Sequence, residues 1–166
     1  DVMDVESTAS RFRYDKRRTE AVVTLASGES VRGFFFTEGG TAHHEGPQRI
    51  VDLLNDERGF FPFEIKAVGG VRTVLHNRSH VITVAVFDDE ARRDPGYDVA
   101  ARRQVALLLT NGRRVEGTVR IYRPEGRDRV SDWTRQPEQF RYIESDTATF
   151  IVNVAHVVTV TEVPAS

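Results

Sequence analysis

The chain alternates short apolar runs with polar turn segments, a pattern that predicts β-strands along most of its length. Each half contains five such runs. In the first half they cover residues 21–25, 30–37, 60–65, 71–76 and 81–87, and in the second half residues 104–109, 115–122, 139–143, 149–152 and 157–163. Ser27 and Gly28 separate the first two runs and predict a hairpin turn. Gly33 and Gly117 lie inside strands, where glycine indicates a bulge, a bend or a close backbone approach.

The second half of the chain repeats the first. Residues 77–84 are Asn-Arg-Ser-His-Val-Ile-Thr-Val, and residues 153–160 are Asn-Val-Ala-His-Val-Val-Thr-Val. Residues 22–33 and 106–117 match in the same way. We therefore predict an all-β fold that admits short helices, built of two tandem five-stranded small barrels related by internal duplication. The predicted segments are a polar and charged lead (1–18), a first barrel (19–87), a linker (88–101) and a second barrel (102–166).

A charged and apolar segment recurs after the second strand of each half. Residues 49–56 carry apolar positions that fit one or two helical turns and equally fit a strand, so the pattern leaves both open. Arg49 and Asp52 match Arg129 and Asp132, and the three-residue spacing predicts a local ion pair that orients the segment. Residues 38–46, rich in Gly, Thr, His and Glu, indicate a loop.

The repeated Asn and His residues allow two interpretations. Asn77 and Asn153 fall between two strands, where a turn is needed and where Asn tolerates a positive φ. His80 and His156 then bond neighbouring backbone or carboxylate groups. The alternative is that both histidines line ligand pockets or a metal site, which the lack of a nearby carboxylate at ligand spacing argues against. We favour the interpretation that the repeated Asn and His residues stabilise turns and do not bind a ligand or a metal.

The composition narrows the class of protein. The 166 residues are 39% hydrophobic and 29% charged, typical of a soluble globular chain. Repeats of about 65 residues are small for separate cores, so we expect one compact body with shared buried surface. A formal charge of -2 gives no overall positive field for nucleic acid. With no cysteine, disulfides and thiol chemistry are excluded, and a cytoplasmic location is the expectation.

Catalytic patterns are missing from the sequence. It has no phosphate-binding glycine loop, no His-Glu-x-x-His and no Gly-x-Ser-x-Gly. Asp88 and Asp89 fall in the predicted linker, where little would desolvate them. His43, His44 and Glu45 are adjacent, but neighbours on an extended chain point opposite ways. We predict a non-enzymatic protein with no cofactor, no metal and no membrane segment.

The order of signals in each half resembles the Sm-like family of small five-stranded barrels, and is similar to uncharacterised bacterial β-barrel proteins and other SH3-like barrels. The matching residues are Leu25, Gly28, Val31, Gly33, Asp52 and Asn55 in the first half, and Leu109, Gly112, Val115, Gly117 and Asp132 in the second. Arg135 stands where the second Asn would be. The family's Arg-Gly is replaced by Asn77-Arg78 and Asn153-Val154. In the family that Asn and Arg hold RNA bases, so the replacements argue against RNA binding. The resemblance also implies edge-strand pairing between modules.

Two functional hypotheses follow. The first is a scaffold that acts through protein contacts or self-assembly, with Phe34, Phe35 and Phe36 as a candidate interface because one of them must point away from its own core. The second is a nucleic-acid binder that uses a local arginine patch. The candidate patch comprises Arg11, Arg13, Arg17, Arg18, Arg113, Arg114, Arg120 and Arg123.

Overall fold

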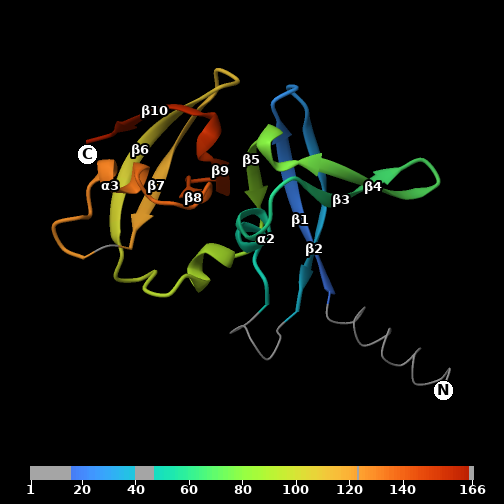
Figure 1. Ribbon diagram of the computed structural model, residues 1–166, viewed down its shortest axis with the longest axis horizontal. Coiled ribbons are helices and arrows are strands. Elements are labelled where there is room, and N and C mark those ends of the chain that lie inside the picture. The colour runs from blue at the N-terminus through green and yellow to red at the C-terminus, as the bar shows by residue number, and fades with distance from the viewer. Residues whose placement is uncertain (1–15, 40–46, 123, 165–166) are drawn as a thin grey trace.

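The computed structural model describes residues 16–39, 47–122 and 124–164, and it confirms the all-β prediction (Figure 1). The first half contains β1 (Lys16–Leu25), β2 (Ser30–Glu38), α2 (Ile50–Asp56), β3 (Phe60–Ala67), β4 (Gly70–Asn77) and β5 (Val81–Val86). The second half contains β6 (Ala101–Leu109), β7 (Arg114–Ile121), α3 (Val130–Thr134), β8 (Phe140–Glu144), β9 (Thr149–Asn153) and β10 (Val157–Glu162). Three short 3₁₀ turns are η1 (Arg78–His80), η2 (Glu90–Arg93) and η3 (Val154–His156).

The ten described strands form one antiparallel sheet in the order β10-β6-β7-β8-β9-β5-β1-β2-β3-β4. The sheet is open, with β10 and β4 at its edges, so the predicted pair of closed barrels is not what these strands form. The physical reason is that β9 pairs with β5 of the other half. The order within each half is nevertheless the same. In both, the last strand pairs with the first, and the others follow in chain order.

The repeated segment for which the sequence allowed either a helix or a strand is a helix in both halves. Asp52 is the third residue of α2 and accepts the Arg49 backbone N–H at 3.1 Å, which caps the helix N-terminus. The carboxylate also pairs with the Arg49 guanidinium at 3.0 Å, as the spacing predicts. Burial raises the pKa of Asp52, but the bonds to Arg49 outweigh it and lower that pKa overall. Asp132 accepts the Arg129 N–H at 3.0 Å, so the helix start is duplicated, but the ion pair predicted between the Arg129 and Asp132 side chains is not formed.

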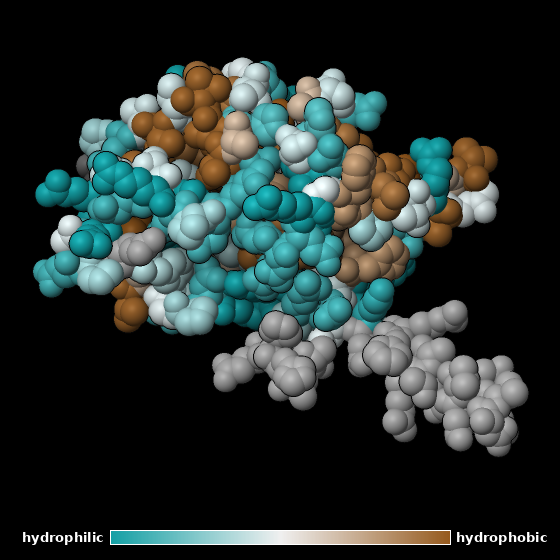
Figure 2. Space-filling model, viewed as in Figure 1, coloured by the Kyte–Doolittle hydropathy of each residue, from teal (hydrophilic) through white to brown (hydrophobic). Residues whose placement is uncertain are grey.

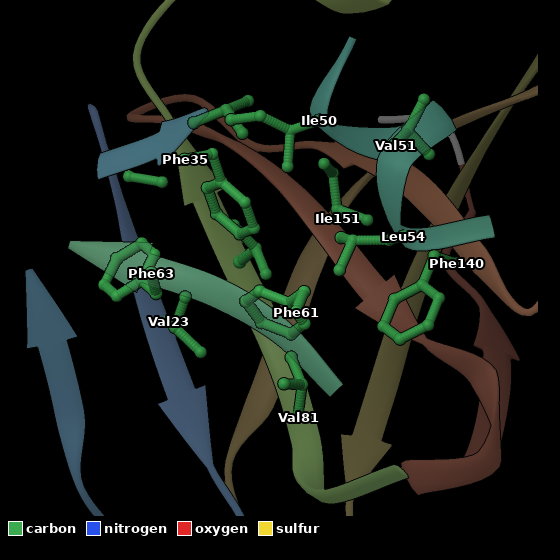
Figure 3. Close-up of a cluster of buried hydrophobic side chains, with 13 residues drawn as sticks. Val23, Phe35, Ile50, Val51, Leu54, Phe61, Phe63, Val81, Phe140 and Ile151 are labelled. Atoms are coloured by element: carbon green, nitrogen blue, oxygen red, sulfur yellow. The ribbon is translucent and has the colours of Figure 1, made fainter. Parts of the chain in front are cut away.

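The buried side chains form two clusters, and each cluster takes residues from both halves. Figure 3 shows the first, where Phe140 and Ile151 of the second half lie with Leu54 and Phe61 of the first. In return, Ile82 of β5 packs in the cluster of the second half. The two halves therefore share buried surface, as their small size predicts.

The paired glycines mark the points where the next strand comes very close. A Cβ at Gly33 would lie 2.3 Å from the backbone oxygen of Glu64, and one at Gly117 would lie 2.4 Å from that of Glu144. These contacts fall beside the single residue pairs that join β2 to β3 and β7 to β8. Of the structures that an in-strand glycine indicates, close backbone approach is the one found.

We expect Gly33→Ala to lower the free energy of unfolding by about 2–3 kcal/mol, because the new methyl group forces β2 and β3 apart. Gly28→Ala is the matched control. Gly28 has a φ of +98° with open space around its Cβ position, so only backbone strain of about 1 kcal/mol is expected. Urea unfolding of both variants measures the difference, and equal losses would contradict the packing argument.

Candidate interaction surface

The junction between the halves is a strand pair. β5 and β9 run antiparallel, with Thr83 opposite Val152 and Val86 opposite Thr149 at the two ends of the ladder. This pairing makes the ten strands one sheet. It also places the two turns η1 and η3 next to each other, and their side chains add the polar contacts of the junction.

Asn153 is the most buried polar residue at the junction, with 0% of its surface exposed. Its Nδ2 donates to the backbone oxygens of Arg78 at 3.3 Å and Val81 at 2.9 Å, both in the first half. Its Oδ1 accepts the Ala155 N–H at 3.0 Å and so caps η3. One amide thus fixes its own turn and binds the turn of the other half.

His156 also crosses the junction. Its Nε2 lies 2.7 Å from the backbone oxygen of Ser79, and its Nδ1 lies 2.8 Å from the hydroxyl of Thr110. A carbonyl oxygen only accepts, so Nε2 carries the proton and Nδ1 accepts from the hydroxyl. The histidine therefore ties β6 and η3 to η1 of the first half.

The repeated Asn residues form turns, but not for the reason that the sequence suggested. Their φ angles are −80° at Asn77 and −83° at Asn153, so neither uses the left-handed region. Instead, each side chain accepts the backbone N–H two residues later, from Ser79 or Ala155, and caps a 3₁₀ turn. The prediction of a turn is confirmed, and its proposed backbone conformation is wrong.

Asn55, at the end of α2, binds the second half like a short piece of strand. Its Nδ2 donates to the Phe140 oxygen and its Oδ1 accepts the Phe140 N–H, both at 2.9 Å. Arg78, which follows Asn77, is also bonded within the chain. Its guanidinium is buried and donates to the backbone oxygens of Leu53 at 2.9 Å and Phe60 at 2.8 Å. Both side chains hold the protein together.

Glu90 is a junction residue that the sequence did not indicate. Its carboxylate accepts the N–H groups of Ile50 and Val51 at 3.1 Å each, and the Tyr142 hydroxyl at 2.6 Å. Burial raises its pKa, although these hydrogen bonds act in the opposite direction. Glu90 falls in a linker dense in charge, where the sequence indicates solvated acids, so no local signal singles it out.

A cavity of about 660 Å³ also lies between the halves, and the three arginines on its wall are bonded within the chain. Arg49 pairs with Asp52 and Asp94. Arg120 donates to the Glu144 carboxylate at 3.0 Å, and Arg141 donates to three backbone oxygens that follow α3 or end it. Within residues 16–39, 47–122 and 124–164, no three His, Cys, Asp or Glu side chains are grouped to hold a metal ion. Because the three arginines are already bonded within the chain, the cavity wall is better suited to a structural role than to binding an anion.

The two open edges of the sheet repeat the residues of the β5–β9 junction, but there these residues are exposed. Three of the large exposed apolar residues are the counterparts of residues buried at the β5–β9 junction, matched by the repeat and by strand register. With the exposed member first, the pairs are Phe60 and Phe140 (60% and 2% exposed), Leu75 and Ile151 (62% and 0%), and Val158 and Ile82 (58% and 1%). Figure 2 shows apolar surface over the β3–β4 hairpin at one end of the molecule and near β10 at the other.

Asn77 is the last residue of the edge strand β4, and His80 follows it in η1. Asn77 is half-buried, and its Oδ1 accepts from the N–H and the hydroxyl of Ser79. Its Nδ2 has no acceptor, and the His80 ring has no hydrogen-bond partner, among the residues that the structure describes. The edge copies of the repeated pair therefore lack the cross-junction bonds that Asn153 and His156 make.

The aromatic triplet lies inside the sheet, because β2 is flanked by β1 and β3. Phe35 is fully buried, and the half-buried Phe34 and Phe36 share the other face of the strand. The Arg18 guanidinium lies 4.2 Å from the centre of the Phe34 ring. At least one ring does point away from the core, and its role as an interface stays a prediction.

The candidate arginine patch is divided in the structure. Arg17 and Arg18 lie at the start of β1, and Arg113 and Arg114 lie at the turn into β7, which Figure 1 shows at the opposite end of the strands. Arg120 is bonded to Glu144 as described. Arg11, Arg13 and Arg123 are outside the described residues, as are His43, His44 and Glu45.

No protein-family model, no curated protein and no solved structure matches this chain. Within the described ranges, neither helix is long and apolar enough to cross a membrane. The function must therefore be inferred from the junction and its open counterparts.

We expect Asn153→Asp to destabilise the protein by at least about 3 kcal/mol, because the carboxylate keeps the acceptor for η3 but faces two backbone oxygens in a buried site. Asn111→Asp is the matched control. Asn111 is exposed in a turn, and its Oδ1 accepts the Arg113 N–H at 3.0 Å, a bond that Asp preserves. Chemical denaturation of both variants gives the comparison, and a small loss at position 153 would contradict the junction described here.

Proposed function

We propose that this chain is a non-enzymatic scaffold protein of two Sm-like repeats that self-assembles through the two open edges of its sheet. The observation that carries the proposal is the contrast between matched apolar residues, buried at the β5–β9 junction and exposed on β3, β4 and β10. The shared strand order of the halves supports the Sm-like assignment. A cytoplasmic location is part of the proposal and agrees with the cysteine-free composition.

The edge strands carry little that would protect them from pairing. Natural sheets blunt their edges with charges, prolines or bulges. β4 has a single charged residue, Arg72, and β10 has only Glu162. The register of β10 against β6 shifts between Val157 and Thr159, but the internal strand β5 has the matching shift against β1 and still pairs with β9. Both strands also present β-branched or aliphatic side chains that lie in a junction when the matching strand is internal. The occupant that fits both edges at once is a second copy of the chain, because each edge is the counterpart of one side of the junction.

Burial of the exposed apolar side chains is not enough by itself to drive association, so hydrogen bonds between the edge strands must contribute as well. Full burial of a large aliphatic or aromatic side chain is worth about 1.5–3 kcal/mol, so three residues that are about 60% exposed contribute roughly 3–5 kcal/mol. Association costs about 4 kcal/mol or more in lost freedom. Strand hydrogen bonds and polar contacts at the turns therefore decide whether the assembly is stable.

The nucleic-acid hypothesis has less support. Asn55, which matches the family's RNA-binding Asn, bonds to the backbone of this chain, and Asn77 stands where the family has its Arg. Arg120 is held by Glu144, and the other described arginines of the patch are divided between the start of β1 and the turn into β7. We therefore propose protein contacts as the function.

We expect the wild-type chain to form oligomers and Leu75→Asp to weaken the association by about 100-fold or more, since the carboxylate would be buried in an apolar contact. Val158→Asp, on the opposite edge, should have the same effect. Val68→Asp is the matched control, because Val68 is fully exposed at the hairpin tip outside the paired register. Light scattering coupled to gel filtration measures the masses. A wild-type chain that stays monomeric at high concentration would sink the proposal.

A further inference from the structure

We infer that Asn77 and His80 form a binding site for the backbone of a second copy of this chain, seated by head-to-tail pairing of β4 with β10 in one register. The inference rests on the proposed self-assembly and adds its polarity, its register and its polar contacts. Its basis is that the internal junction is a complete example of the contact, made by the other copy of the same residues.

The internal junction supplies the geometry of the site. Asn153 donates from Nδ2 to the backbone oxygens of Arg78 and Val81, and His156 meets the backbone oxygen of Ser79. These three acceptors belong to η1 and the first residue of β5. The matching acceptors on the next copy are the backbone oxygens of η3 and of the first residue of β10. They are Val154 and Val157 for Asn77, and Ala155 for His80.

Asn77 is already held in the orientation that such a contact needs. Its Oδ1 accepts the Ser79 N–H at 3.1 Å, as Asn153 accepts the Ala155 N–H at 3.0 Å. This fixed bond leaves the Nδ2 free for an acceptor beyond the open edge. A side chain ordered before binding loses little conformational entropy when the partner arrives.

The junction register also fixes the partners along the strands. β9 pairs with β5 with Ile151 opposite Val84. Transferred to the open edges, the same register gives four pairs between one copy and the next. They are His76 with Thr159, Leu75 with Val160, Val74 with Thr161, and Thr73 with Glu162.

One feature of the edge agrees with this register. His76 is buried to 7% exposure against Phe61 and Phe63, and its Nε2 has no hydrogen-bond partner among the described residues. The register sets the Thr159 hydroxyl on the same face as this nitrogen.

Pairing of β4 with a second β4 offers no such match. In the antiparallel arrangement of this sheet, it would place each η1 against the start of the other β4, where Asn77 and His80 meet no turn, and it would leave the exposed Val158 of β10 without a cover. The internal contact joins unlike surfaces, and repetition of unlike surfaces gives a closed ring or an open filament. The inferred contact is therefore directional.

The register is tested by disulfide trapping in the full chain, which has no native cysteine to interfere. The double variant Val74→Cys with Thr161→Cys should oxidise to a covalent series longer than dimers on a non-reducing gel. Each single variant is the control and should stay uncrosslinked. Covalent dimers from either single variant, with no series from the double variant, would show like-to-like pairing and overturn the inference while leaving self-assembly standing.

The polar site is tested by substitutions that keep the turn. Asn77→Asp retains the cap to Ser79 but turns a carboxylate towards the partner's backbone oxygens, so we expect about 100-fold weaker association. His80→Ala should weaken association about 5- to 20-fold, and His80→Gln, which keeps an N–H near the Nε2 position, should restore most of it. Sedimentation gives the dissociation constants, and thermal melting confirms folding. Unchanged association in a folded Asn77→Asp would overturn the site, whereas a monomeric wild type would defeat the proposed function first.

Discussion

The pairing of β5 with β9 is the contact on which the rest of the structure depends. It joins strands from different halves, so β5 and β9 each have one neighbour in their own half and one in the other. The apolar side chains follow the strands, and therefore Ile82 packs in the second cluster while Phe140 and Ile151 pack in the first. Neither half keeps a core of its own residues alone, which explains how repeats of about 65 residues reach a stable size.

The same contact leaves the molecule with two unlike ends. Each half has two different edges, and the junction uses one edge from each half. One edge of each kind, β4 and β10, therefore remains unpaired in the whole chain. Repeat proteins that stay separate cover such ends with polar capping units. Here the ends carry Phe60, Leu75 and Val158 on the surface, which are the matched forms of junction residues. The exposed apolar residues at the two ends of the sheet are thus a consequence of the β5–β9 junction.

Polar groups at the joint act as structural parts. Asn55, Asn153 and His156 each satisfy backbone groups of the opposite half, where an unpaired buried group would cost about 1–3 kcal/mol. Glu90 does the same for the start of α2 and holds the linker beside β8 through Tyr142. A side chain used in this way has little capacity left for an external ligand. This is why positions that resemble an RNA site bind the chain itself.

Local stereochemistry made part of this predictable. Short apolar runs in the sequence predicted the ten strands. Gly28 indicated a turn, in which it has a φ of +98°, and Gly33 indicated a close backbone approach. The Arg49–Asp52 spacing predicted the ion pair, although apolar spacing alone did not separate helix from strand. The sequence did not predict the junction contacts of Glu90 and Asn55, because their partners are 39 to 85 residues away in the chain. Contacts at that distance leave no periodic trace.

The sequence by itself determined the duplication, the strands, the turns and the capped helix starts, since each depends on residues a few positions apart. Only the tertiary structure decided that β9 pairs with β5, and so which copy of each matched residue is buried. Both copies have the same local pattern, and a strand's pattern specifies its faces without specifying its neighbour. The choice between closing a half and joining two halves is made by packing across the whole sheet.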